Sequence, residues 1–196
     1  MASKVIALSG PAGSGKSEAG RYLVDAHGYQ TVKFSGPLKA MLRAFYVSVG
    51  LDDHDEIERR IEGDLKEVPD RYLNGATPRH AMQTLGSEWG RGLMSDDFWI
   101  RSWERKVDSV EGPVVTDDCR FENEAEAVMA AGGEVIRLHP KVFRRGTSSH
   151  ASECGISSDW VNHVVTNDGS IADLNDKMLD IIHPVHVVTF GPPESE

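Results

Sequence analysis

A glycine-rich stretch with one lysine stands near the start of the chain. It reads GPAGSGKS, residues 10–17, and fits the spacing G-x-x-x-x-G-K-[ST] in full. Glycines let a backbone take left-handed angles and turn its N–H groups toward an anion. The amine of Lys16 can approach the outer phosphates of a nucleotide, and the hydroxyl of Ser17 can ligate Mg²⁺.

The context of this stretch supports a phosphate-binding loop, or P-loop. An apolar run at residues 5–8 precedes it, and a helical pattern follows it. A helix that begins at the loop adds the positive end of its dipole to an anion site. We therefore expect ATP and Mg²⁺ to bind here, at Gly10, Ala12, Gly13, Ser14, Gly15, Lys16 and Ser17.

A second candidate site is the segment TPRHAMQTLGSEWGR, residues 77–91. On a helix, Arg79, Gln83 and Gly86 share one face because they are spaced at i, i+4 and i+7. A cation suits a monophosphate, an amide suits the edge of a base, and a missing side chain admits a flat ring; the hydroxyl of Ser87 lies beside that gap. The same spacing is also compatible with an amphipathic helix whose polar residues are merely solvated.

Two tryptophans in DDFWIRSW, residues 96–103, are four positions apart and can line one wall. Trp99 could offer a stacking surface to a base, whereas either ring could instead pack in the core.

The segment VVTDDCRFENEAE, residues 114–126, carries charge directly after a buried strand. Ligands of open α/β sheets bind at the carboxyl ends of strands, so Asp117, Asp118 and Arg120 are expected at a cleft. One aspartate, Asp117 in our assignment, could help to hold Mg²⁺, and Arg120 could neutralise phosphate charge. A capping aspartate with an Arg–Asp pair is the alternative. Glu124 could contact a ligand or simply favour the dipole of its helix.

A basic loop follows the next strand, with Lys141, Arg144 and Arg145. As a lid over about 139–155, it would close over the nucleotide and bring an arginine to the transferring phosphoryl group. A basic surface loop without that role is equally compatible with the residues. Cys119 and Cys154 are expected to be ordinary reduced thiols.

The elements that must position these residues alternate along the chain. Strands are predicted at 4–9, 31–35, 114–116, 134–138 and 162–166, and helices between and after them at 16–26, 37–49, 77–89, from 96 or 97, from 123 and at 170–182. This alternation predicts an α/β fold with a parallel sheet wrapped by helices on both faces. We expect a single domain over 1–183 and a tail at 184–196. The charged insert at about 51–75 is expected to be a helical hairpin or a mobile insert on the surface.

Composition excludes several classes of protein. The net charge of −10 argues against a general nucleic-acid binder, which would show a basic face. No apolar stretch approaches the roughly 20 residues that span a bilayer, and the first residues lack the apolar core of a signal peptide. We expect a cytoplasmic protein without a membrane partner. A guanine-reading NKxD segment is missing, so a compact kinase with a second, anionic substrate fits better than a GTPase.

The segments TPRHAMQTLGSEWGR, DFW and VVTDDCRFENEAE, in this order after a P-loop, resemble the phage-type deoxynucleoside monophosphate kinases. The resemblance runs from Lys4 to about Ile182 and includes FSGPLK at 34–39 and VTNDGS at 165–170. It implies a three-layer α/β/α P-loop NTPase fold with a helical NMP-binding insert and a short lid. The implied reaction moves the γ-phosphoryl group of ATP to a deoxynucleoside 5′-monophosphate, and the implied assembly is a homodimer.

The resemblance also implies roles for individual residues. Asn167 would join the ATP site, and His80 and Ser87 stand where some relatives carry another basic residue and a threonine. The acceptor would bind Lys39, Arg79, His80, Gln83, Gly86, Ser87, Trp99, Asp118, Arg120 and Glu124. Catalysis would rest on Lys16, Arg79, Asp118, Arg120, Arg144 and Arg145.

Two other functions stay open. A dephospho-coenzyme A kinase has a similar size and P-loop placement, but TVKFSGPLK offers Ser35 and Lys39 where an acidic residue would be expected. A regulatory module that binds a nucleotide without turnover is the second alternative, and paired Asp117 and Asp118 with Arg120 argue against it.

Overall fold

The computed structural model describes residues 5–140 and 155–183. Its centre is a five-stranded sheet in which every pairing is parallel, as the alternation of elements predicts. The strand order is β2-β3-β1-β4-β5. The strands are β1 (Val5–Ser9), β2 (Gln30–Thr31), β3 (Val114–Thr116), β4 (Glu134–Pro140) and β5 (His163–Asn167).

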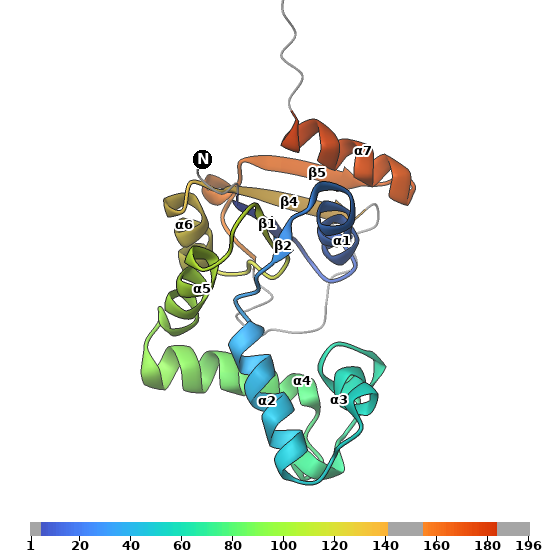
Figure 1. Cartoon of the computed structure of the whole chain (residues 1–196), viewed down its shortest axis with the longest axis vertical. Coiled ribbons are helices and arrows are strands. Elements are labelled where there is room, and N and C mark those ends of the chain that lie inside the picture. Colours follow the sequence, from blue (N-terminus) through green and yellow to red (C-terminus); the bar gives the residue numbers. More distant parts are fainter. Residues whose placement is uncertain (1–4, 141–154, 184–196) are drawn as a thin grey trace, which may run out of the picture.

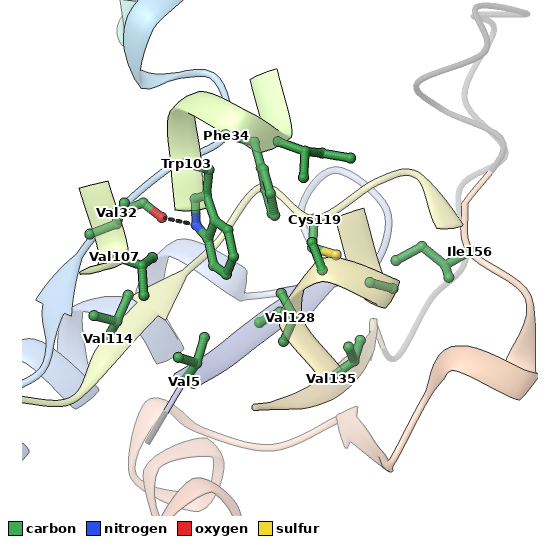
Figure 2. Close-up of a cluster of buried hydrophobic side chains, with 14 residues drawn as sticks. Val5, Val32, Phe34, Trp103, Val107, Val114, Cys119, Val128, Val135 and Ile156 are labelled. Carbon is green, nitrogen blue, oxygen red and sulfur yellow. Dashed lines mark hydrogen bonds between the residues drawn. The ribbon is translucent and has the colours of Figure 1, made fainter. Parts of the chain in front are cut away.

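Helices cover both faces of this sheet (Figure 1). Alternate residues of β1 enter different cores because successive side chains of a strand point to opposite faces. Ile6 and Leu8 pack against α1 (Lys16–His27) and α7 (Ile171–Ile182). Val5 and Ala7 pack against α5 (Phe98–Asp108) and α6 (Glu122–Ala130), in the cluster shown in Figure 2. The predicted three-layer α/β/α arrangement is therefore confirmed.

A group of helices extends from one end of the sheet and forms what we call the helical lobe (Figure 1). Its own small core contains Leu42, Tyr46, Leu51, Ile57 and Ile61. The elements are α2 (Gly36–Ser48), α3 (His54–Ile61), the 3₁₀ turns η1 (Asp64–Glu67) and η2 (Arg71–Leu73), α4 (Pro78–Gln83) and the π-helix η3 (Thr84–Met94). The insert predicted at 51–75 thus holds one α-helix and two 3₁₀ turns, not a helical hairpin.

The second strand is shorter than the predicted 31–35. The amide of Val32 still bonds to the carbonyl of Val115, 3.0 Å away, but the next amides leave the sheet. Those of Phe34 and Ser35 donate to the carboxylate of Asp118 instead, at 3.0 and 2.9 Å. The chain therefore turns into α2 early.

The helix expected to end near Trp89 continues to Met94 and changes its hydrogen bonding on the way. From Thr84 onward it is a π-helix, a form that often occurs at functional sites. Asn123 was expected to cap α6, but the helix begins one residue before it, at Glu122, and Phe121 is the N-cap. The side chain of Asn123 contacts Arg91 and Asp96 instead.

The carboxyl ends of β1, β3 and β5 lie on the same edge of the sheet because the strands are parallel. The glycine-rich loop, the segment after Thr116 and Asn167 all belong to this edge. Within the two described ranges, no helix is both long and apolar enough to cross a membrane.

Candidate functional site

The glycine-rich loop connects β1 to α1 and folds as the spacing predicts. Gly10, Gly13 and Gly15 have φ angles of 135°, 76° and 101°, which other residues rarely adopt. A Cβ on Gly10 would lie 2.3 Å from the carbonyl oxygen of Leu138, so the loop also needs glycine for close packing. Lys16 Nζ donates to the carbonyls of Gly10 and Pro11, at 2.7 and 2.8 Å. The lysine is therefore held at the mouth of the loop.

Asn167, at the end of β5, touches the same loop. Its Nδ2 donates to the carbonyl of Ser14 at 3.1 Å. A Cβ on Gly15 would lie only 2.5 Å from this nitrogen. The structure thus places the predicted Asn167 beside the phosphate-binding loop.

A depression lies beside the start of α1. Both predicted metal ligands, Ser17 and Asp117, line it. Lys33, which the sequence analysis missed, lies within 2.9 Å of the Asp117 carboxylate. Burial lowers the pKa of Lys33, but Asp117 and more distant carboxylates outweigh this, so the pKa is raised. A hydroxyl and a carboxylate are the hard oxygen donors that Mg²⁺ prefers, so this pair fits that ion. In the described part of the chain, no three His, Cys, Asp or Glu side chains gather as a metal site on their own.

The main pocket lies between the sheet and the helical lobe. Helices α2, α4, α5 and η3, the turn η1 and the segment after β3 all contribute to its wall. The predicted residues that line it are Lys39, Arg79, Gln83, Gly86, Ser87, Trp99, Asp118, Arg120 and Glu124.

One predicted acceptor residue is not in this wall. The side chain of His80 lies on the exposed side of α4, because that helix turns Arg79, Met82 and Gln83 toward the pocket. The expected role of His80 in the acceptor site therefore stays a prediction that the geometry of this pocket does not support. Lys141, Arg144 and Arg145 lie outside the described residues, as do most of the predicted lid and Cys154.

The π-helix brings in a cation that the sequence analysis missed. Twelve residues separate Arg79 from Arg91, which on an α-helix places them roughly 120° apart, at ~100° per residue. The wider π-helical turns of η3 bring Arg91 to the pocket wall together with Ser87. The position of Arg91 in the pocket wall could have been predicted only from a sequence pattern that indicates a π-helix.

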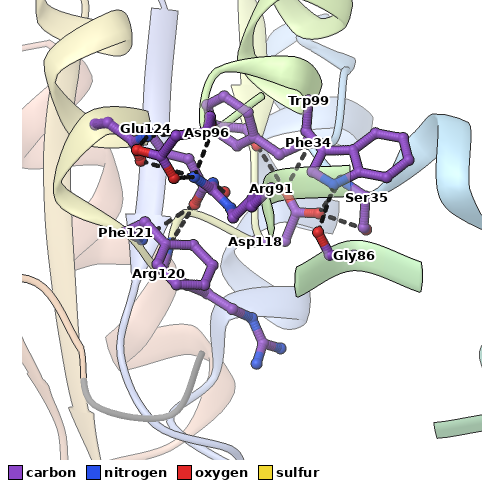
Figure 3. A network of polar contacts seen from close by, with 12 residues as sticks. Phe34, Ser35, Gly86, Arg91, Asp96, Trp99, Asp118, Arg120, Phe121 and Glu124 are labelled. Atoms are coloured by element: carbon purple, nitrogen blue, oxygen red, sulfur yellow. Dashed lines mark hydrogen bonds and ion pairs between the residues drawn. The ribbon is translucent and has the colours of Figure 1, made fainter. Parts of the chain in front are cut away.

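Arg91 forms a buried pair with Glu124 (Figure 3). Its Nη2 is 2.6 Å from Glu124 Oε1, and its guanidinium lies 4.0 Å from the centre of the Phe121 ring. Glu124 Oε2 accepts from the backbone amides of Arg120 and Phe121, at 2.7 and 3.1 Å. Burial raises the pKa of Glu124 to about 7, against the opposing effect of these amides and Arg91. Glu124 therefore caps its own helix and also holds Arg91 in the wall.

Asp118 fastens the segment after β3 to the start of α2 (Figure 3). Beyond the two backbone amides, it accepts from Ser35 Oγ at 2.5 Å and from Thr116 Oγ1 at 2.9 Å. Its carboxylate is thus saturated by hydrogen bonds within the protein. The capping aspartate considered from the sequence differs from this geometry, because α2 has no side-chain cap hydrogen bond and the donors are Ser35, Phe34 and Thr116.

The two tryptophans differ in their surroundings. Trp103 is 1% exposed, stacks on Phe34 with ring centres 4.7 Å apart, and donates to the carbonyl of Val32. It is a core residue. Trp99 lines the pocket but is only 3% exposed, and its Nε1 donates to the carbonyl of Gly86 at 2.7 Å. Little of the Trp99 ring is left for stacking, whereas the half-buried Phe121 also lines the pocket.

Chemically, the two sites complement each other. The P-loop presents backbone amides and Lys16 to phosphates, and the main pocket offers cations together with amide, hydroxyl and aromatic groups. Arg120 lies in the segment after β3, directly beyond the Asp117 of the depression. The arrangement can hold two phosphorylated molecules side by side.

Comparison with known proteins identifies the family. A family model described as deoxynucleotide monophosphate kinase matches residues 51–178. A protein of Acanthamoeba polyphaga mimivirus, named for the same activity, is 30% identical over 195 residues, covering 91% of this chain and 95% of its own. The deoxynucleotide monophosphate kinase of Escherichia phage RB69 is 31% identical over 125 residues, covering 60% of this chain and 50% of its own.

Among solved structures, shikimate kinase from Acinetobacter baumannii covers 92% of this chain and 93% of its own, with 17% identity and a TM-score of 0.45. A likeness at that level does not bear on the substrate. The family match spans more than half of the sequence, and the mimivirus relative is matched over almost its whole length. This chain belongs to the deoxynucleotide monophosphate kinase family.

Proposed function

We propose that this protein transfers the γ-phosphoryl group of ATP to a deoxynucleoside 5′-monophosphate, giving the diphosphate and ADP. The observation that carries the proposal is the main pocket. It combines cations with polar and aromatic groups in a member of this kinase family, and its wall residue Asp118 directly follows Asp117, which lines the depression beside Ser17 of the P-loop. ATP would bind along the loop at residues 10–17 with Asn167, and the acceptor would bind in the pocket.

The reaction needs little covalent chemistry from the protein. An oxygen of the acceptor phosphate, already anionic, forms a bond to the γ-phosphorus, while the bond from that phosphorus to the β–γ bridging oxygen breaks. Alignment of the two nucleotides and neutralisation of the developing charge supply the acceleration. Lys16 and Arg120 would carry this charge, together with Arg144 or Arg145 from the proposed lid.

Mg²⁺, held by Ser17 and Asp117, would neutralise charge on the β- and γ-phosphates. Lys33 would then share the Asp117 carboxylate and keep it oriented beside α1. Gln83, Ser87 and Arg91 would contact the base and sugar, while Asp118 and Glu124 would hold the wall in shape.

The testing experiment measures ADP release from ATP and Mg²⁺ with dAMP, dGMP, dCMP, dTMP and dephospho-coenzyme A offered separately. Turnover with at least one of the deoxynucleotides is expected, and the ranking would define the base preference. Turnover with dephospho-coenzyme A alone would favour that kinase activity. Tight ATP binding without any turnover would favour the regulatory module. We further propose a cytoplasmic homodimer built from single domains, and light scattering of the purified protein tests the dimer.

A further inference from the structure

Lys66 carries a half-buried charge that the described residues leave without direct compensation. It lies in η1 and lines the main pocket. Within residues 5–140 and 155–183, its ammonium takes part in no hydrogen bond and no ion pair. Burying a cation without a partner costs free energy, so an anion that enters the pocket would find a favourable contact here.

Three further cations surround the same space. Lys39 of α2, Arg79 of α4 and Arg120 of the segment after β3 line the pocket with Lys66. Burial lowers the pKa of Lys66, and the charges of these three neighbours lower it further, against the opposing effect of Glu62, so the pKa is lowered overall. Four cations from four separate parts of the chain repel one another, and a dianionic phosphate would relieve that repulsion.

Two carboxylates now compensate part of this charge. Glu62 Oε1 lies 2.7 Å from Lys39 Nζ, and Glu67 pairs with Nε of Arg79. Both glutamates and Lys66 lie on the segment that follows α3. Neither glutamate belongs to the pocket wall, so each compensates a cation of the wall from outside it.

We propose that Lys66 binds the 5′-phosphate of the acceptor, and that this phosphate must displace Glu62 and Glu67 from Lys39 and Arg79. This inference rests on the proposed function, since it assigns the acceptor phosphate to one part of the pocket. A phosphate carries more charge than one carboxylate and can bind an arginine with two parallel hydrogen bonds, which favours the exchange. Removing Lys66 and removing either glutamate therefore have opposite effects on acceptor affinity.

The first test replaces Lys66 by Met, which keeps the length and loses the charge. We expect the KM for dTMP, or for the best deoxynucleotide, to rise about tenfold or more, since charged hydrogen bonds are the strong ones. The KM for ATP should stay within about twofold, and Lys66→Arg should recover most of the loss. Arg59→Met is the matched control because Arg59 is an exposed cation of α3 paired with Asp64, outside the pocket.

A second readout separates phosphate binding from a structural role. The matching deoxynucleoside, which has no phosphate, is used as a competitive inhibitor of the wild-type enzyme and of Lys66→Met. Its inhibition constant should be the same in both. An equal loss for deoxynucleoside and deoxynucleotide, or an unchanged KM for the deoxynucleotide, would overturn the role of Lys66.

The third test removes the competing carboxylates one at a time. Glu67→Gln and Glu62→Gln should each lower the KM for the acceptor by about threefold, because a competing charge-assisted bond is lost. Asp64→Asn serves as the control, since Asp64 lies in the same turn and pairs only with Arg59 among the described residues. An acceptor KM that rises or stays constant in both glutamate variants would contradict the displacement.

Calorimetry with dTMP keeps this inference distinct from the proposed function, since binding needs no turnover. Binding of dTMP that weakens in Lys66→Met, with no ADP release by the wild type, would support the phosphate site and contradict the proposed reaction. ADP release by the wild type with an affinity that does not depend on Lys66 would overturn the phosphate site alone.

Discussion

At the scale of single residues, Lys16 is the group on which, in our proposal, phosphoryl transfer depends most directly. Its amine is held at the mouth of the P-loop by two carbonyl oxygens, 2.7 and 2.8 Å away, so it is ready to turn toward a phosphate. In Lys16→Ala, we expect kcat to fall by roughly two orders of magnitude or more, because charge on the transferred group is no longer neutralised. Steady-state ADP release measures this, and a melting curve checks that the variant is folded. Turnover near the wild-type rate would contradict the role of the loop.

Glu124 gives a prediction on the pH dependence of stability. Its pKa of about 7 in the folded protein lies above the ordinary value of 4.5, so the folded state holds the proton longer than the unfolded state. Its contribution to the free energy of unfolding is therefore complete below about pH 4.5 and is lost as the pH rises through 7. A shift of this size corresponds to about 3 kcal/mol.

Urea unfolding of the wild type and Glu124→Gln at several pH values tests this contribution. The variant lacks the titrating group, so the free energy of unfolding of the wild type minus that of the variant should decrease from pH 4.5 to 7.5. A difference that increases over this range would mean that Arg91 keeps Glu124 ionised in the folded protein.

At the scale of elements, the π-helix η3 shapes one wall of the pocket through Gly90. A Cβ there would lie 2.3 Å from Trp99 Nε1, so Gly90→Ala must displace the indole that bonds to Gly86. We expect Gly90→Ala to lose roughly 1–3 kcal/mol in free energy of unfolding. Its KM for the acceptor should be higher than that of the wild-type enzyme. Tryptophan fluorescence during urea unfolding and steady-state kinetics measure the two effects.

Gly92→Ala is the matched control on the same helix, because the nearest atom to its Cβ would be 3.4 Å away. It should unfold and bind the acceptor nearly as the wild type does. Equal behaviour of the two alanine variants would mean that Gly90 does not set the position of Trp99.

The elements show which features follow from local sequence patterns. Strand β1, the glycine loop and α1 are predictable because an apolar run, left-handed glycines and a helical pattern follow one another. The early end of β2 is not, since it depends on bonds from Phe34 and Ser35 to Asp118, about 84 residues further along the chain. The π-helical turns that bring Arg91 to the wall are likewise invisible to a rule based on α-helical spacing.

The candidate site likewise contains residues whose positions follow from local sequence and residues whose positions depend on distant contacts. Residues within one short segment, such as Arg79, Gln83 and Gly86, line the same pocket as expected because a helix fixes their common face. Lys66 and Phe121 were missed because only the packing of the helical lobe against the sheet brings them to the pocket. His80, which the resemblance alone suggested, lies on the exposed side of α4 and outside this pocket wall.

At the scale of the whole molecule, the main pocket, which we propose binds the acceptor, is divided between the sheet and the helical lobe. Lys39 and Arg79 come from the lobe, whereas Arg120 and Glu124 follow β3. Any change in the angle between the two parts alters the pocket. Asp118 is a polar fastening at this junction, because it accepts three hydrogen bonds from Phe34 and Ser35 and a fourth from Thr116 at the end of β3.

We therefore expect Asp118→Asn to loosen the junction. The amide of asparagine places a donor where two of these donors already point, so the variant should lose roughly 3 kcal/mol in stability. Hydrogen exchange should quicken at the amides of Phe34 and Ser35 but not within α1, and the KM for the acceptor should rise more than that for ATP. Ser35→Ala removes only one of the four bonds and should show a smaller change in the same direction. A loss of kcat in Asp118→Asn with unchanged exchange at the junction would instead place the Asp118 carboxylate in the chemical step, so the exchange measurement decides between fastening and catalysis.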